Sequence, residues 1–280
     1  MNISATARES HGKARRAGNS SAVEMAGRAG FVARGVIYIL VGLLALRIAF
    51  SDGGGKQADR GGALSEISQK PFGSVLLWIL GIALVGMALW RLSEAAFGAA
   101  GPDGEKATKR LASAGRAVFY GFVAYSVLMF AAGDKGSGSG KSDAQSQDTT
   151  AKVLDLPGGR WIVGVAGVAV AGIGLYIAAR AAMRKFHKRL RLDDMSRTTR
   201  RGVDIVGVFG GVSRGVVFAV AGGFAVSAAV KARSGEAKGM DDTLRSFAST
   251  PAGPWLLAVI AVGLMAFGLF SFANAKWRKI

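Results

Sequence analysis

The chain has 280 residues, half of them hydrophobic, with 41 glycines, no cysteine and a formal net charge of +18. The lack of cysteine excludes disulfides, thiol catalysis and thiolate metal sites in this sequence, and two histidines are too few for a histidine metal site. The hydrophobic residues form blocks separated by charged segments, which is typical of a multi-pass membrane protein and not of two soluble domains.

Six apolar blocks predict six transmembrane helices, because a helix needs about 20 mostly apolar residues to cross the bilayer core. Three of the blocks carry no charged residue: 71–90, 161–179 and 250–275. The others are shorter and reach the required length when the arginine before each is included: 35–50, 117–133 and 215–230. Arginine is tolerated there because its long side chain can extend the guanidinium to the interface.

The segments between these blocks are polar. Residues 1–22 are small, polar and basic and predict a disordered tail, and residues 23–30 predict a short amphipathic lead-in to the first span. The low-complexity run 133–150 predicts a flexible loop. The run 180–201 interleaves basic and apolar residues, which predicts that the fourth helix continues as an amphipathic helix on the membrane surface. Docking of this run to an acidic partner is the alternative.

The first helix of each pair repeats one pattern around an arginine. Each arginine is followed by glycine or alanine, and an aromatic residue lies four positions after it; the three are Arg34, Arg116 and Arg214. The second helix of each pair opens with a proline and a glycine two positions later, at Pro71, Pro157 and Pro251. An aromatic residue follows each proline by nineteen positions, where an interfacial aromatic is expected: Trp90, Tyr176 and Phe270.

These repeats predict an all-α fold of three parallel helical hairpins, which suggests a pseudo-threefold arrangement about the membrane normal. The hairpins are predicted at 23–98, 107–183 and 205–275, with a basic loop at 184–204 and a basic end at 276–280.

The positive charge is distributed unevenly along the chain. Most of the excess lies in the tail, in the second and fourth loops and after the last span. Because positive loops stay inside, both termini are predicted in the cytoplasm, with the protein in the plasma membrane. The charge is therefore interpreted as a topology signal, and no nucleic-acid partner is expected.

The three repeated arginines are the most specific polar feature. In the simplest interpretation they anchor each helix at the cytoplasmic interface. The alternative is that Arg34, Arg116 and Arg214 form a ring that binds an anion or an acidic lipid headgroup, since they occupy the same place in every repeat.

Small residues recur every fourth position along the fifth span and predict a helix contact face, since close backbone approach drives packing in lipid. They include Gly207, Gly211, Gly215, Ala219 and Gly223. Packing within the protein is the simpler interpretation, and dimerisation through this face is the alternative.

Signatures of catalysis and transport are weak in this sequence. It has no phosphate-binding loop and no carboxylate pair at metal-ligand spacing, so neither an enzyme nor a cofactor is expected. Four of its five prolines, Pro71, Pro157, Pro251 and Pro254, lie at helix starts, and polar residues near mid-span are sparse. The leading hypothesis is a non-enzymatic protein that binds membrane lipids, a membrane-protein partner or a second copy of itself. A solute or ion transporter with a path along the pseudo-threefold axis is the alternative.

The chain resembles bacterial membrane proteins of the domain-of-unknown-function 1206 family. The resemblance rests on three units with ARG or SRG opening one helix and P-x-G opening the next, and on RKFHKRLRLDDM followed by GGVSRGVVFAVAGGF. It covers residues 26–275. It implies three repeated transmembrane hairpins and no known activity, so it identifies no catalytic residue.

Overall fold

The structure is a computed structural model that describes residues 21–50, 58–98, 106–134, 142–231, 233, 237–238, 240–248 and 252–279. Nearly all of these residues are helical, and six helices are long and apolar enough to cross a membrane. They are α2 (Ser21–Phe50), α4 (Gly73–Phe97), α5 (Ala107–Ala131), α7 (Gly159–Ala182), α8 (Arg197–Lys231) and α10 (Gly253–Trp277). The prediction of an all-α, six-span membrane protein is confirmed.

A short helix precedes the second long helix of every repeat. These are α3 (Arg60–Ser68), α6 (Ser142–Leu154) and α9 (Met240–Ala248). We call the side of the bundle with these helices the short-helix side. The opposite side, where α2, α5 and α8 begin and α4, α7 and α10 end, is the terminal side.

The repeated P-x-G motif is explained by how each short helix meets the long one. The glycine is the first residue of α4, α7 and α10. A Cβ on Gly73, Gly159 or Gly253 would overlap a carbonyl oxygen of the preceding short helix: that of Ile67, Val153 or Ala248. Only glycine therefore lets the chain turn this tightly into the membrane.

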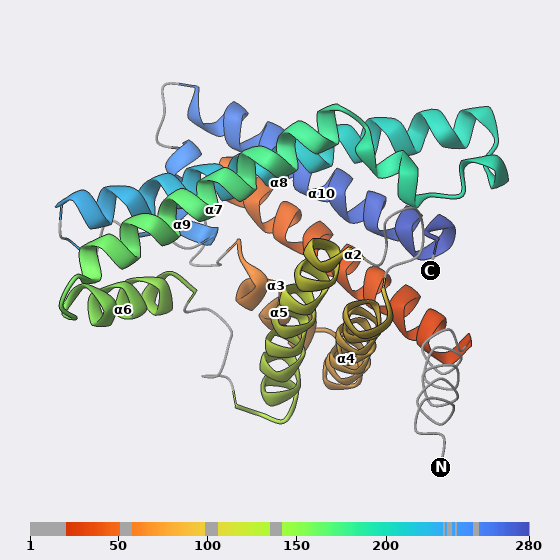
Figure 1. Ribbon diagram of the computed structural model, residues 1–280, viewed down its shortest axis with the longest axis horizontal. Coiled ribbons are helices and arrows are strands. Elements are labelled where there is room, and N and C mark those ends of the chain that lie inside the picture. Colours follow the sequence, from red (N-terminus) through yellow and green to blue (C-terminus); the bar gives the residue numbers. More distant parts are fainter. Residues whose placement is uncertain are drawn as a thin grey trace, which may run out of the picture.

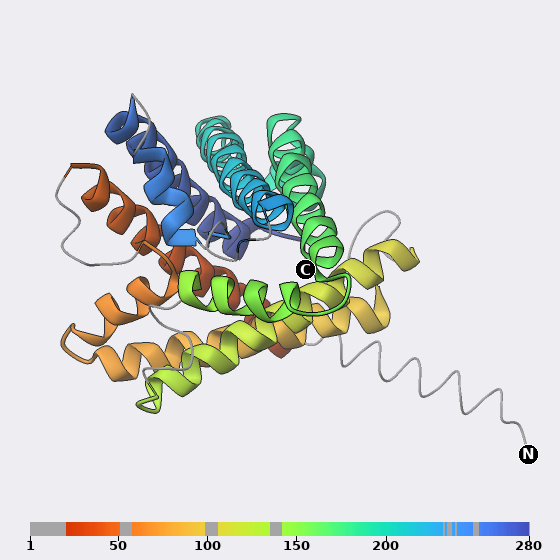
Figure 2. The ribbon, with the colours of Figure 1, turned by 90° about the vertical axis from the view of Figure 1, so that its left-hand side faces the viewer.

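The contacts between the long helices place them in an open ring. In Figure 1, α2, α7, α8 and α10 run across the view, and α4 and α5 lie below them. In order, α5 packs on α4, α4 on α2, α2 on α10, α10 on α8, and α8 on α7. The ring is not closed, because α5 and α7 make at most marginal contact over their fully described lengths. Figure 2 shows the α4–α5 pair diverging from the α7–α8 pair. This order is the one that a pseudo-threefold axis requires, with one interface left open.

The most extensive helix contacts join one repeat to the next and use small residues. Between α7 and α8, a Cβ on Gly215 would lie 2.6 Å from the carbonyl oxygen of Gly174. Between α10 and α2, a Cβ on Gly268 would lie 2.8 Å from the carbonyl oxygen of Gly35. Gly35 and Gly215 both follow a repeated arginine, so the two interfaces are equivalent.

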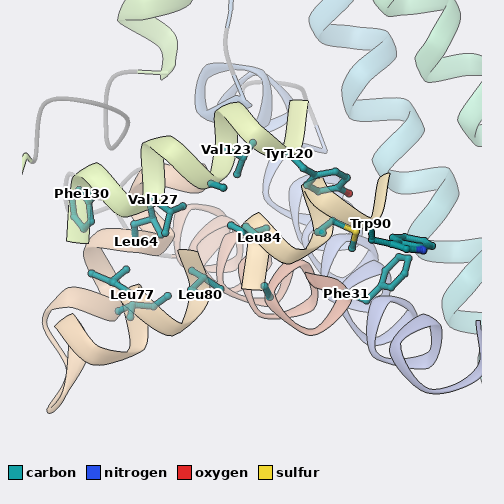
Figure 3. Packing of buried hydrophobic residues seen from close by; sticks show 14 residues of the cluster. Phe31, Leu64, Leu77, Leu80, Leu84, Trp90, Tyr120, Val123, Val127 and Phe130 are labelled. Atoms are coloured by element: carbon teal, nitrogen blue, oxygen red, sulfur yellow. The ribbon is translucent and has the colours of Figure 1, made fainter. Parts of the chain in front are cut away.

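The buried core lies in two main parts. One joins α2, α4 and α5 and is lined by side chains such as Phe31, Leu84 and Val127 (Figure 3). The other joins α2, α8, α9 and α10 and is mostly aliphatic, with Leu257 and Leu264 fully buried. Of the six spans, α10 is the most enclosed and α7 the least.

Two predicted segments differ from the structure. The lead-in at 23–30 is not a separate segment, because α2 runs without a break from Ser21. The second half of the run predicted as a flexible loop, from Ser142, is helix α6, in which alanine, glutamine and lysine favour helix formation. The tail at 1–20, the segment 135–141 and Pro251 lie outside the described residues.

The prediction of an amphipathic helix after α7 is wrong. Arg184 adopts a left-handed conformation with a φ of 52°, which ends the helix. Two short 3₁₀ turns follow, at Lys185–Arg189 and Leu192–Asp194. Leu190 of the run packs inward and is buried among residues of α8 and α10, whereas Met183 is exposed.

Candidate functional site

The first repeated arginine lies inside the bundle at the terminal side. Its Nε donates to Oγ of Ser271 at 3.0 Å, and its Nη1 donates to the phenol oxygen of Tyr120 at 3.3 Å. The Arg34 guanidinium also lies 4.7 Å from the ring centre of Phe31 and 5.1 Å from that of Phe267. Arg34 of α2 thus joins α5 to α10.

The third repeated arginine lies next to the first. The guanidinium of Arg214 is 4.8 Å from the ring centre of Phe267, which Arg34 also contacts. It lies over Phe218 and Tyr38 as well, at 5.2 and 5.7 Å. The structure therefore brings Arg34 and Arg214 together around one aromatic ring.

The aromatic residue four positions after each arginine takes part in this arrangement. Arg34 contacts Tyr120 of the second repeat, and Arg214 contacts Tyr38 of the first. Each contact joins a repeat to the next one around the ring. The equivalent contact from Arg116 to the third repeat would cross the open interface, and Arg116 is exposed there.

Arg116 is close enough to other charged side chains at the terminal side to interact with them electrostatically. Arg91, Arg189 and Glu94 are among its charged neighbours. Of the three repeated arginines, two are therefore packed into the bundle and the third lies at the edge of its opening.

Sequence reasoning missed a buried ion pair on α4. Arg91 and Glu94 are 4% and 7% exposed, and Nη1 of Arg91 lies 2.6 Å from Oε2 of Glu94. Ser113 of α5 donates to the same Glu94 oxygen at 3.2 Å. The guanidinium of Arg91 also stacks 4.1 Å from the ring centre of Trp90.

A repeat signal could have found this pair. The residue that follows the repeated proline by 23 positions is polar in all three copies: Glu94, Arg180 and Asn274. Three positions earlier the copies carry Arg91, Ile177 and Ser271. All of these residues lie in the last turns of the second helices, so the polar positions gather at the terminal side.

Two further arginines come from segments after α7 and α10 that pair with each other. The backbone N–H of Arg191 donates to the carbonyl of Trp277 at 2.8 Å, and that of Lys279 donates to the carbonyl of Arg189 at 2.9 Å. Leu190 and Arg278 form an isolated antiparallel bridge between these bonds. This pairing fixes Arg189 and Arg278 at the terminal side.

Arg278 is enclosed among other cations. It is 8% exposed, and its guanidinium lies 5.1 Å from the ring centres of both Phe31 and Trp90. Burial, followed by the charge of Arg91, lowers the pKa of Arg278 well below its usual value. Burial and then the charge of Arg180 lower the pKa of Arg189. Both shifts are signs of positive charges crowded away from water.

We call these six residues the arginine cluster: Arg34, Arg91, Arg116, Arg189, Arg214 and Arg278. Glu94 is the acidic neighbour that Arg116, Arg189 and Arg278 share. The Nε atoms of Arg91, Arg214 and Arg278 are buried and have no hydrogen-bond partner among the described residues. Buried charge without compensation is costly, and guanidinium groups bind phosphate and carboxylate through paired N–H donors. The cluster is therefore suited to hold an anion.

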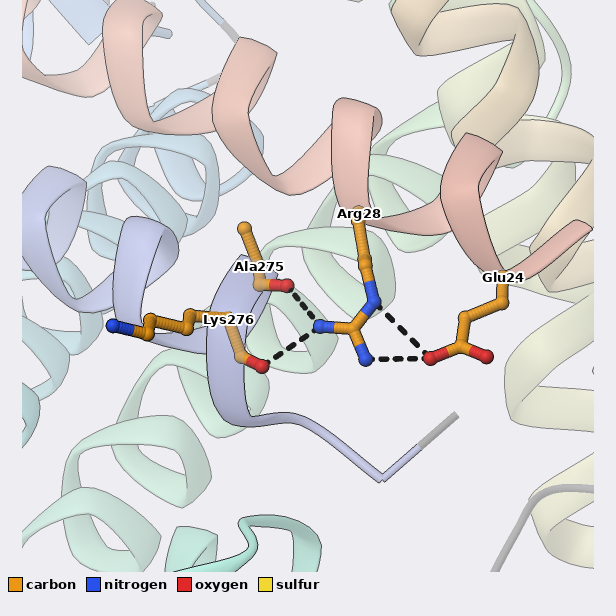
Figure 4. Close-up of polar contacts among 4 residues, drawn as sticks. All are labelled: Glu24, Arg28, Ala275 and Lys276. Atoms are coloured by element: carbon orange, nitrogen blue, oxygen red, sulfur yellow. Dashed lines mark hydrogen bonds and ion pairs between the residues drawn. The ribbon is translucent and has the colours of Figure 1, made fainter. Parts of the chain in front are cut away.

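A second set of arginines closes the ends of helices. Nη1 of Arg28 donates to the carbonyls of Ala275 and Lys276 at 2.5 and 2.7 Å, and its Nη2 pairs with Glu24 at 2.5 Å (Figure 4). These carbonyls end α10 and have no partner within the helix, so the arginine caps them.

The second repeat has the equivalent cap. Arg110 donates to the carbonyls of Ala95 and Ala96 at the end of α4, both at 2.8 Å. Arg28 and Arg110 each lie six positions before a repeated arginine, and the third copy has Val208 at that place. The end of α7 therefore lacks this cap.

The predicted small-residue face of α8 changes direction along the helix. A Cβ on Gly207 would lie 2.8 Å from Phe186, and one on Gly211 would overlap Ala181. Gly215 and Ala219 face α7. Gly223 has no described atom within 4 Å of its Cβ position, and Gly222 contacts α7 in its place. A fourth-residue stripe rotates about 40° per step around a helix of 3.6 residues per turn, so the contact moves to a third-residue step.

The arrangement offers hydrogen-bond donors and positive charge. Among the described residues, no three His, Asp or Glu side chains gather in a way that could hold a metal ion. His187 pairs with Asp204, near the start of α8. The cluster can therefore bind an anion through guanidinium donors supported by hydroxyl and aromatic groups.

Comparison with known proteins matches the repeat architecture. The family described as "Domain of Unknown Function (DUF1206)" matches residues 29–98, 111–184 and 209–278. The chain is also 27% identical over 260 residues to a protein of Bacillus subtilis (strain 168) described as "Uncharacterized protein YxxB". That similarity covers 90% of this chain and 92% of the Bacillus protein. No solved structure matches the chain.

Proposed function

Since this chain belongs to the DUF1206 family, whose three matches coincide with its three helical hairpins, we propose that it binds the phosphate of an anionic membrane lipid and catalyses no reaction. The arginine cluster is the binding site. The terminal side faces the cytoplasm of a cell bounded by the plasma membrane, which is supported by the excess of basic residues on that side.

One observation carries the proposal. Six guanidiniums converge at one side of the bundle, and Glu94 is the acidic group shared by three of them. Three of the six have a buried Nε with no hydrogen-bond partner in the part of the chain that the structure describes. A buried charge requires a counter-charge, and a lipid phosphate supplies both the charge and several acceptor oxygens. The headgroups of anionic lipids also lie at the membrane surface, where the transmembrane helices end.

Transport along the ring axis is less well supported. A transport path needs polar groups near the middle of the membrane. The described residues of the second core, between α2, α8 and α10, are mostly aliphatic and include Val41, Leu44 and Leu264. A binding site confined to the terminal side is in better agreement with this core.

The test is the lipid retained by the purified full-length protein. We expect phosphatidylglycerol to be enriched over its share of the source membrane, as measured by mass spectrometry. Replacing Arg116→Gln together with Arg278→Gln should reduce the enrichment about tenfold or more, because each removes charge-assisted hydrogen bonds. Arg201→Gln, an exposed arginine of α8 outside the cluster, is the matched control and should leave it unchanged.

A second arm separates the lipid from a free anion. Short-chain phosphatidylglycerol should raise the thermal unfolding temperature, whereas inorganic phosphate at equal concentration should have little effect. Equal stabilisation by both would assign the site to a soluble anion. Unchanged lipid enrichment in the double variant would overturn the proposal.

A further inference from the structure

The second repeat differs from its two siblings in one interface. Helices α2 and α4 of the first repeat pack together, as do α8 and α10 of the third. Helices α5 and α7 of the second repeat make at most marginal contact. The three repeats therefore supply two closed hairpins and one open one.

Two glycines account for the closed hairpins. In the first repeat a Cβ on Gly27 would lie 2.9 Å from the ring of Trp90, and one on Gly30 would overlap Met87. In the third repeat a Cβ on Gly207 would lie 3.0 Å from the ring of Phe270, and one on Gly210 would overlap the backbone of Phe267. Close packing of each hairpin thus requires glycine at both positions.

The second repeat lacks both glycines. Counted from the repeated arginine, the equivalent residues of α5 are Lys109 and Ala112. At the position of Lys109, the closed hairpins have no room even for a Cβ atom beside the aromatic ring. A lysine side chain therefore cannot be accommodated there. The sequence itself therefore prevents α5 from closing on α7.

The walls of the opening are apolar. Ile173 and Tyr176 of α7 are 55% and 59% exposed, although their equivalents in the closed hairpins are buried beneath the first helix. Those buried equivalents are Met87, Trp90, Phe267 and Phe270. On α5, Phe119 is 55% exposed, whereas the equivalent Val217 of α8 is buried.

The opening is cationic at its terminal end. Arg116 is exposed on α5, and Arg189 follows α7. Behind them lie the buried Arg91 and Arg278, whose Nε atoms have no hydrogen-bond partner among the residues that the structure describes. Apolar walls that end at a group of arginines match a molecule with acyl chains and an anionic headgroup. A soluble anion would gain nothing from the walls, and an apolar helix would add no negative charge to Glu94, the acidic neighbour that several of these arginines share.

We infer that the α5–α7 opening is the lateral entrance through which the acyl chains of an anionic phospholipid lie between the two helices while its phosphate contacts Arg116 and the arginines behind it. This inference rests on the proposed function and adds the route and the position of the chains. The lipid completes the ring where the second hairpin leaves it open.

Site-specific photocrosslinking tests the inference. p-Benzoylphenylalanine replaces Phe119 or Ile173 in the full-length protein, which is reconstituted in phosphatidylcholine vesicles with a minor fraction of phosphatidylglycerol. Ile82 of α4 and Val259 of α10 are matched control positions, because they are apolar and exposed on other faces. Crosslinked lipids are identified by mass spectrometry.

We expect phosphatidylglycerol at the two opening positions to exceed its vesicle fraction by about tenfold, and the control positions to match the vesicle fraction. Arg116→Gln should abolish the excess. Crosslinks at the vesicle fraction at all four positions, or crosslinks to a second copy of the chain, would overturn the inference. If phosphatidylglycerol still co-purifies in that case, the proposed binding stands and only the route fails.

Discussion

Among the described helices, the contacts between successive repeats are present at all three interfaces, whereas the contacts within a repeat are present at only two of three. The interfaces α4–α5, α7–α8 and α10–α2 are all present and are the most extensive in the bundle. The interfaces within repeats, α2–α4 and α8–α10, are smaller, and α5–α7 is open. The unit that repeats in the sequence is therefore not the unit that packs. The packed pair is the second helix of one repeat with the first helix of the next. The contact between the two helices of a hairpin differs from repeat to repeat.

The strongest test of this comparison is an overpacked interface between repeats. Gly174→Leu should destabilise the protein by about 3 kcal/mol or prevent folding, because a Cβ would overlap the backbone of Ala219 on α8. Gly172→Leu is the control, since no described atom lies within 4 Å of its Cβ position. Chemical unfolding in detergent measures both. Equal loss in the two variants would show that the α7–α8 interface does not depend on close backbone approach.

A closed hairpin should open when it receives the residues of the open one. Gly27→Lys with Gly30→Ala gives α2 the side chains that α5 carries, and it should cost about 1–3 kcal/mol through collision with Trp90 and Met87. Because the chain has no cysteine, spin labels at Val32→Cys and Ile82→Cys can report the α2–α4 distance. We expect a longer distance in the variant. An unchanged distance would mean that another feature keeps α5 from α7.

The capping arginines should have the smallest effect. Arg28→Gln removes two hydrogen bonds to the last carbonyls of α10 and should destabilise the protein by about 1 kcal/mol, a value reduced for partial exposure. Arg110→Gln, at the more exposed end of α4, should cost less. Thermal unfolding of the two variants gives the order. A larger loss at Arg110 would contradict the view that burial sets the strength of the cap.

The number of the spans could be predicted from sequence because it depends on local patterns. Apolar length identified the six helices, and the offsets from Arg34 and Pro71 identified the repeat. The glycine of each P-x-G motif could be recognised as a repeated position. Its reason, a carbonyl oxygen of the preceding short helix, becomes visible only when that helix is placed.

The arginine cluster depends on contacts that a single sequence does not display. Arg91 and Arg278 lie 187 positions apart in the numbering and are gathered at the same two rings, Phe31 and Trp90. The open α5–α7 interface could not be recognised from the sequence alone either. Its sequence feature is that α5 carries Lys109 and Ala112 at the positions where α2 and α8 carry glycine. The contact with α7 is made by Gly222 and not by Gly223, because a helix has 3.6 residues per turn. A fixed four-residue spacing therefore predicts the wrong glycine.

The pairing of α2 with α10 sets an order in time for the assembly of the bundle. Arg28 caps a carbonyl 247 residues further along the chain, so the glycine face of α2 enters the membrane long before its partner helix has been synthesised. The α4–α5 interface joins neighbouring spans and forms early, and α7–α8 follows in the same way. Contacts between distant segments form slowly. Among the described helices, α2 therefore meets α4 early and α10 last, and until then the small residues that face α10, such as Gly35, are open to lipid or to another helix.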